Sequence, residues 1–331
     1  MIMKRLLILF IFILAACTRE ASSRYVSCNL ILIPHVASTR AGVPDEGLIT
    51  DYNLFIFNSL GILEESCYVS ARQLKKDHGL VVHNSRLLLD APYTVLLAAN
   101  LGFELKISSL EQARSYRYYL AYPDEYSRGI PMAYSGEGVR IGEDGQLELP
   151  LERLMARIDL QLDRSALDQD VRIKVTQVRV AGCPSSVLLF SPSKAQTAAQ
   201  VFPLGFTREG SAVSALNEEI TLGHSKTLSL YLLENLQGDL LDNVQADSDK
   251  VLTDGLYNQV CSYIEIQADY HSSAWHTQAG GKLVYRFYLG ENLNNFDVVR
   301  NGLYRITVRL KGNGLSEESW RIDKSALVPG A

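Results

Sequence analysis

The chain has 331 residues, of which 47% are hydrophobic and 21% charged, and its formal net charge is −5. This composition is ordinary for a globular protein, and the length suggests about two domains. The charges are spread along the chain without a basic block, so the sequence argues against nucleic acid as a partner.

The first segment has the layout of a secretory signal. Lys4 and Arg5 precede an uncharged run from Leu6 to Leu14, which is too short to span a membrane. The run ends in Leu-Ala-Ala-Cys, which resembles the bacterial lipobox. That resemblance implies that residues 1–16 are removed, that Cys17 carries lipid, palmitate included, and that the mature protein is an outer-membrane lipoprotein. The alternative is an ordinary secretory signal with a chance cysteine.

Four further cysteines are scattered along the chain. In an oxidising compartment they could form disulfides in any of three pairings, or they could serve as small buried hydrophobic residues. Their spacing is too wide for a zinc site, and we expect neither a metal nor another cofactor. The four are Cys28, Cys67, Cys183 and Cys261.

Short apolar runs bounded by Gly, Pro, Asn, Asp or Ser follow one another from Tyr25 onward, which is typical of β-strands. One run alternates apolar and charged residues, with a slip near Gln177 that predicts a bulge. Helices do not separate the strands regularly, so the pattern favours an all-β protein of antiparallel sandwiches. The expected strands are 28–36, 51–58, 93–100, 172–180, 226–235, 262–270, 283–290 and 303–312.

A short helix is expected at 108–122, where Ser108 or Ser109 provides a cap. A domain boundary is expected near Pro150, after the turn at Glu143 to Gly145. This gives a segment 17–40 with the lipid and the first strand, an N-terminal domain 41–150 and a C-terminal domain 151–331. Because no flexible linker lies between the domains, we expect them to pack rigidly.

Catalytic signatures such as G-x-S-x-G, H-E-x-x-H or a P-loop are missing, so we expect no enzyme and no catalytic residue. The glycine-rich stretch 136–145 fits tight turns better than a phosphate loop. His271 and His276 flank Trp275 in a stretch that supplies no third metal ligand.

Two clusters allow a binding role. Five aspartates in 238–255 miss the EF-hand pattern, because Val251 stands where an oxygen ligand is needed, so a solvated acidic loop is favoured. A group of tyrosines could form a platform for a glycan or a protein, although such groups are more often half core and half surface. These tyrosines are Tyr116, Tyr118, Tyr119, Tyr122 and Tyr126.

The C-terminal third carries a family resemblance. The segments LSLYLLEN (228–235), SYIEIQADY (262–270) and above all Tyr285 to Gly312, with its Asn-rich turn, Asn-Phe-Asp-Val and Tyr-Arg-Ile-Thr-Val, resemble the fimbrillin superfamily of Bacteroidales, the subunits of type V pili. Further similarity lies in 39–61, 130–138 and 151–162. The resemblance implies two Greek-key, transthyretin-like β-sandwich domains with one or two short helices.

The resemblance also implies assembly by strand exchange. In the polymerising members of that superfamily an arginine-specific protease cuts in the loop after the first strand. The C-terminal strand of another subunit then fills the groove that the first strand leaves. The corresponding candidates here are the strand Cys28–Val36, cleavage between Arg40 and Ala41, and donor residues Trp320 and Ile322.

The implied protein is a minor anchor or tip subunit of a fimbrium on the cell surface. Its implied partners are other fimbrial subunits and, through the N-terminal lipid, the outer membrane. The alternative is a surface lipoprotein adhesin that binds a host glycan or protein.

Overall fold

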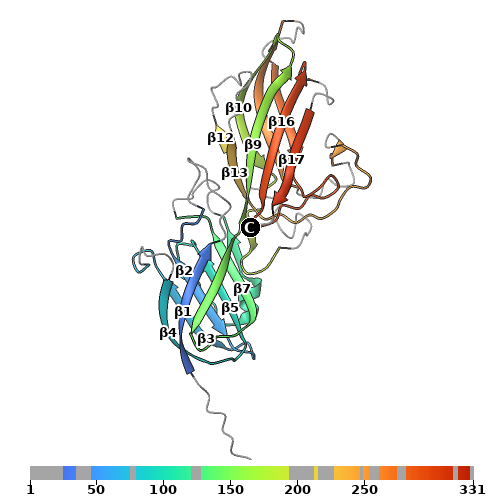
Figure 1. The fold of residues 1–331 in the computed structure, drawn as a ribbon. Helices are drawn as coiled ribbons and strands as arrows, with labels where there is room; N and C mark the ends of the chain where they lie inside the picture. Colours follow the sequence, from blue (N-terminus) through green and yellow to red (C-terminus); the bar gives the residue numbers. More distant parts are fainter. Residues whose placement is uncertain are drawn as a thin grey trace, which may run out of the picture.

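Strands build two lobes that meet near the middle of the molecule (Figure 1). The computed structural model describes residues 25–34, 46–74, 80–120, 128–193, 212–214, 227–246, 249–252, 261–273, 281–315 and 320–328. The expected all-β fold is confirmed, since the strands form mainly antiparallel sheets and the described helix is short.

The N-terminal lobe holds seven strands in the order β3-β2-β5-β7-β8-β1-β4. The contact between β7 and β8 is limited to two residue pairs, Met132 with Arg153 and Ala133 with Glu152. Beyond it the strands separate into two sheets, β3-β2-β5-β7 and β8-β1-β4, whose side chains share one core. The bounds are β1 Tyr25–Pro34, β2 Tyr52–Phe57, β3 Leu63–Val69, β4 Leu80–Leu88, β5 Tyr93–Ala99, β7 Met132–Val139 and β8 Gln146–Arg153.

Strand β2 is buried on both faces. Tyr52, Leu54 and Ile56 pack into the core between the two sheets, whereas Phe55 and Phe57 join a second apolar cluster on the opposite face. All six residues of the strand are buried. A strand covered on both sides is apolar at nearly every position, which explains why this segment does not alternate; Asn53 is the exception and is buried as well.

The expected helix is correct at its start and wrong at its end. Helix α2 covers only Leu110–Ser115, and the Ser109 side chain caps it by accepting a hydrogen bond from the Gln112 amide. The backbone turns extended at Tyr116, and β6 (Arg117–Tyr119) pairs with β11 (Ser186–Leu188). Tyrosines favour strands, and this pairing supplies main-chain hydrogen bonds that override the helical pattern.

The C-terminal lobe is a sandwich of two four-stranded sheets, β12-β10-β14-β15 and β13-β9-β16-β17. The bulge expected near Gln177 is confirmed, because the register of β10 against β14 shifts between Val175 and Gln177. The bounds are β9 Met155–Leu167, β10 Val171–Ala181, β12 Ala212–Ser214, β13 Leu228–Leu233, β14 Tyr263–Ser272, β15 Gly281–Tyr288, β16 Leu303–Gly312 and β17 Trp320–Val328.

The two lobes are joined without a linker, since β8 ends at Arg153 and β9 begins at Met155. The segment after β10 turns back, and Val187 and Leu189 pack into the same apolar cluster as Phe55 and Leu96 of the N-terminal lobe. The expected domain boundary near Pro150 stays a prediction, because it concerns whether the segments on its two sides fold independently.

The Tyr52 hydroxyl is buried, and it has no hydrogen-bond partner among the residues that the structure describes. We expect Tyr52→Phe to leave the free energy of unfolding unchanged or to raise it by up to about 1 kcal/mol, because it removes an unsatisfied polar group. The matched control is Tyr93→Phe, which removes the acceptor of the Leu88 amide (2.8 Å) and should lower stability by roughly 1 kcal/mol. Urea denaturation of both variants measures the difference, and a loss for Tyr52→Phe equal to that for Tyr93→Phe would contradict the assignment.

Gly145 lies against β1. Its φ is +64°, and a Cβ there would lie 2.1 Å from the Ser27 carbonyl oxygen. Gly145→Ala should therefore displace β1 and cost more than Gly138→Ala, whose φ is +68° but whose Cβ would meet nothing within 4 Å. In the control Gly138→Ala the loss of stability comes from the left-handed backbone conformation alone, which costs on the order of 1–2 kcal/mol. Equal losses in urea denaturation would show that the contact with β1 is unimportant.

Candidate functional site

The described residues that bear on strand exchange are those around β1. Several residues singled out from the sequence lie outside the described part of the chain and keep the status of predictions. They are Cys17, Arg40, Ala41, Tyr122, Tyr126, Asp247, Asp254, Trp275 and His276.

Strand β1 is an inner strand of its sheet. Residues Asn29–Pro34 run parallel to Gln146–Leu151 of β8, and Tyr25–Ile31 run antiparallel to β4. Main-chain groups on both sides of β1 are therefore paired. Withdrawal of β1 would leave two facing rows of unpaired N–H and C=O groups on β8 and β4, which is a template for another strand.

Strand β1 lies against apolar core residues. Cys28 is 1% exposed and packs in the core between the two sheets. The register sets Leu30 and Leu32 opposite Leu147 and Leu149 of β8, and Leu147 and Leu149 are buried in that core. A replacement strand would therefore lie against an apolar core.

Burial keeps the cysteines protonated. It raises the pKa of the Cys28 thiol to about 11 and that of Cys261 to about 12. Burial, with the nearby Glu65 carboxylate, raises the pKa of Cys67 to about 11. Cys183 is buried in the core of the C-terminal lobe. Of the two interpretations left open from the sequence, the structure favours small buried residues.

Both ends of the segment after β1 lie beside β8. Pro34, the last residue of β1, pairs with Leu151 of β8, and the Glu46 side chain contacts that of Arg153 two residues further along the same strand. Eleven residues, 35–45, connect Pro34 to Glu46, and Arg40 is among them.

Glu46 is fully buried at the junction of the lobes. Its carboxylate binds the guanidinium of Arg153 and, at 2.9 Å, that of Arg157, and it accepts a hydrogen bond of 2.8 Å from the Tyr231 hydroxyl. Arg157 also binds Asp159 at 2.8 Å. This cluster was not predicted from the sequence. The available signal is two arginines within the apolar segment LERLMARIDL, since buried arginines need an anionic partner.

The charges in the cluster act on one another. Burial lowers the pKa of Arg153, although the Glu46 carboxylate opposes this shift. Burial alone would also lower the pKa of Arg157, but the hydrogen bond to Asp159 and the charges of Asp159 and Glu46 raise it above its ordinary value. Both guanidinium groups are therefore cationic, and the carboxylates hold them in place.

A second polar network fixes the residues that follow Glu46. The Asn100 side chain accepts a hydrogen bond from the Thr50 amide and donates to the Leu48 carbonyl, each at 2.8 Å. The Asp51 carboxylate accepts from the amides of Leu101 and Gly102, both at 3.1 Å. The chain is held from Glu46 to Asp51, directly before β2.

Strand β17 lies at the edge of the other lobe. It pairs with β16, which sets Trp320 opposite Leu310 and Ile322 opposite Val308. Both partners are core residues. Among the described strands β16 is its one neighbour, and β17 runs back toward the junction of the lobes (Figure 1).

The remaining sequence candidates form no chemical centre in the described part of the chain. No group of three or more His, Cys, Asp or Glu that could hold a metal occurs among the described residues. His271 is exposed on β14, and Asp249 accepts a hydrogen bond from the Ala246 amide within the acidic loop. Tyr116 and Tyr118 pack against the second apolar cluster, whereas Tyr119 is 63% exposed.

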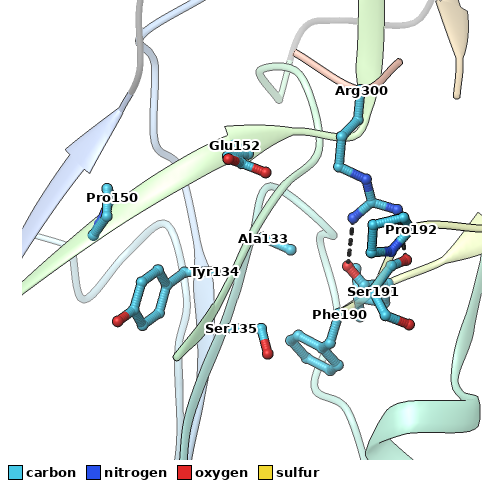
Figure 2. A pocket seen from close by; sticks show the side chains of 10 residues that line it. Ala133, Tyr134, Ser135, Pro150, Glu152, Phe190, Ser191, Pro192 and Arg300 are labelled. Atoms are coloured by element: carbon cyan, nitrogen blue, oxygen red, sulfur yellow. Dashed lines mark hydrogen bonds between the residues drawn. The ribbon is translucent and has the colours of Figure 1, made fainter. Parts of the chain in front are cut away.

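A pocket of about 250 Å³ opens where β7 and β8 separate (Figure 2). Tyr134 and Glu152 line it together with Phe190 and Arg300. Arg300 is occupied by the Glu234 carboxylate at 2.9 Å and by the main-chain carbonyls of Leu188 and Ser191. The arginine therefore tethers the segment after β10 to the C-terminal lobe.

In the part of the chain that the structure describes, no helix has the length and apolar character needed to cross a bilayer.

The family model of a domain of unknown function (DUF4906) matches residues 230–308. No curated protein matches the chain. The matched residues run from within β13 to within β16, in the region that carries the resemblance noted in the sequence.

Solved structures match over nearly the whole chain. A "putative cell adhesion protein" from Parabacteroides distasonis has a TM-score of 0.62 and 11% identity, covering 92% of this chain and 97% of its own. The tip fimbrial protein Mfa3 from Porphyromonas gingivalis, with a C-terminal truncation, has a TM-score of 0.57 and 12% identity over 91% and 99%. The fimbrilin FimA from Porphyromonas gingivalis has a TM-score of 0.52 and 12% identity over 86% and 90%.

These three proteins are named for fimbriae or cell adhesion, and none is named as an enzyme. At such low identity the likeness concerns the fold. The chain therefore has the two-lobed β-sandwich fold of Bacteroidales fimbrillins and related cell adhesion proteins.

Proposed function

We propose that the protein is a structural subunit of a cell-surface fimbrium, joined to its neighbours by exchange of β-strands. The single observation that supports this most is the setting of β1. It is paired on both sides by main-chain hydrogen bonds, its Cys28 packs in the apolar core that the two sheets share, and Arg40 lies in the chain that follows it. A strand with these properties can be replaced by one of similar pattern without loss of the sheet.

In this proposal a protease cleaves between Arg40 and Ala41. Residues 17–40, which include β1, then form the part that leaves, and the chain from Ala41 onward stays folded. The buried contacts of Glu46 and Asp51 support this division, because they hold the retained chain close to the cut. Within the retained chain we propose the domains 41–150 and 151–331.

The donor strand in the proposal is β17, with Trp320 and Ile322 as the residues that fill a neighbour's groove. An edge strand with one described partner can separate from its sheet more readily than an inner strand. Once it separates, the residues after Gly312 could extend by about 60 Å, enough to reach another subunit.

We further propose a minor anchor or tip role, with lipid on Cys17 and attachment to the outer membrane. An anchor keeps its lipid and β1, whereas a tip loses both when Arg40 is cut. The proposed partners are other fimbrial subunits. An adhesin for host glycan or protein is the alternative function, supported by the names of the structural relatives and by the exposed Tyr119 ring.

Limited digestion of the full-length protein in detergent with an arginine-specific protease tests the proposal. We expect one early cut that gives an N-terminus at Ala41, and Arg40→Lys should abolish it. Arg72→Lys, at an exposed turn arginine, is the matched control and should leave this cut unchanged. Mass spectrometry of the fragments gives the result, and early cutting elsewhere with Arg40 intact would contradict the proposal.

Withdrawal of β1 is measured by the reactivity of Cys28. In the intact protein the buried thiol, whose pKa is raised to about 11, should alkylate slowly at pH 8. After the cut, a peptide of residues 313–331 added as donor should speed the alkylation of Cys28 at least tenfold. The same peptide with Trp320→Asp and Ile322→Asp is the control, and equal rates with both peptides would count against strand exchange.

Mass spectrometry of the mature N-terminus of the native protein distinguishes an anchor subunit from a tip or stalk subunit. Acylated Cys17 retained in sheared fibres would indicate an anchor, whereas an N-terminus at Ala41 would indicate a tip or a stalk subunit. Glycan-array binding by the purified protein would favour the adhesin instead.

A further inference from the structure

One buried carboxylate is bonded to both lobes. Glu46 contacts Arg153 at the end of β8, which belongs to the N-terminal lobe. The same carboxylate contacts Arg157 on β9 and the hydroxyl of Tyr231 on β13, which belong to the C-terminal lobe. Glu46 is 0% exposed, so water does not compete for these bonds.

The cluster is balanced, with two guanidinium groups facing two carboxylates, those of Glu46 and Asp159. The two carboxylates are not equivalent. Asp159 binds Arg157 and accepts a hydrogen bond from Ser229, both at 2.8 Å. Arg153 bonds Glu46 and the neutral amide oxygen of Asn301. Among the described residues no carboxylate other than Glu46 bonds Arg153, so loss of the Glu46 charge would leave this arginine buried without an anionic partner, which is strongly unfavourable.

The position of Glu46 in the chain places the cluster next to the groove that holds β1. It lies six residues after Arg40, and it is the first residue described after β1. Strand β8, which carries Arg153, is also the strand against which β1 lies in parallel. The cluster therefore stands at one end of the β1 groove, on the side that the retained chain occupies.

We propose that Glu46 is a positioning residue that locks the two lobes together and holds the start of the retained chain when β1 leaves. The second part rests on the proposed function, because it presumes that β1 is withdrawn. The locking of the lobes does not depend on it. The lock keeps the groove wall β8 at a fixed angle to the lobe that carries the donor strand.

The test compares the full-length wild type with Glu46→Gln in detergent, before and after cutting with the arginine-specific protease. Glu152→Gln is the matched control, since Glu152 is exposed and directly precedes Arg153. Hydrogen exchange of the peptide 46–51 reports on the retained chain. Electron-spin distances between labels on p-acetylphenylalanine at Leu60 and Leu315, both exposed, report on the lobes.

In the cut wild type and the cut control we expect peptide 46–51 to stay protected, and in cut Glu46→Gln we expect its exchange to rise at least tenfold. In the uncut chain we expect the Leu60–Leu315 distance distribution to be narrow for wild type and control and broad for Glu46→Gln. Wild-type behaviour of Glu46→Gln in both measurements would overturn the proposal.

Two further outcomes are decisive. If Arg40 is not cut in any variant, the strand-withdrawal function fails, and the distance distribution of the uncut chain still decides whether Glu46 locks the lobes. If Glu46→Gln does not fold, Tyr231→Phe replaces it, because that change removes one hydrogen bond and keeps every charge. Tyr231→Phe should broaden the distribution less but in the same direction, and an unchanged distribution would overturn the lock.

Discussion

The N-terminal lobe depends on a strand that pairs with both β8 and β4, a place that β1 occupies. This pairing closes one sheet of the lobe, and Cys28 of β1 packs in the core that the two sheets share. The same pairing sets β8 in place, and β8 continues almost directly into β9 of the other lobe. One strand near the start of the chain thus organises residues that follow it by more than a hundred positions.

The N-terminal lobe has three layers. The sheet that contains β2 and β5 lies in the middle, with the β1 sheet on one face and the segment from Leu101 to Leu120, together with β11, on the other. The outer layer is drawn partly from the C-terminal half of the chain, because Val187 and Leu189 belong to it. Each lobe therefore depends on the other for part of its packing, which explains how two lobes can be joined without a linker.

Local patterns in the sequence predicted much of this architecture. The alternation of β10 and the mostly apolar sequence of β2 each have a local cause, namely burial on one face or on both. The end of α2 could not be predicted, because the pairing of β6 with β11 joins residues about seventy positions apart. The parallel partners of β1 and β9 were beyond prediction for the same reason.

The candidate site was predicted unevenly. A resemblance pointed to the first strand and to the tail, and both are strands in the structure. Glu46 was missed because the stretch Asp45-Glu46-Gly47 has the composition of an ordinary exposed turn. Its partners Arg153 and Arg157 are far along the chain, and the alternating pattern of a strand does not reveal what a buried charge will meet.

The register of β1 has a mechanical consequence. Six residues of β1 pair with β8 and seven pair with β4, so a pull along the strand axis strains many hydrogen bonds at the same time. Peeling the strand from one end breaks them one after another, at roughly 1 kcal/mol for each bond. A strand seated in this groove would therefore resist shear along its length while yielding to a zipper-like exchange that starts at an end.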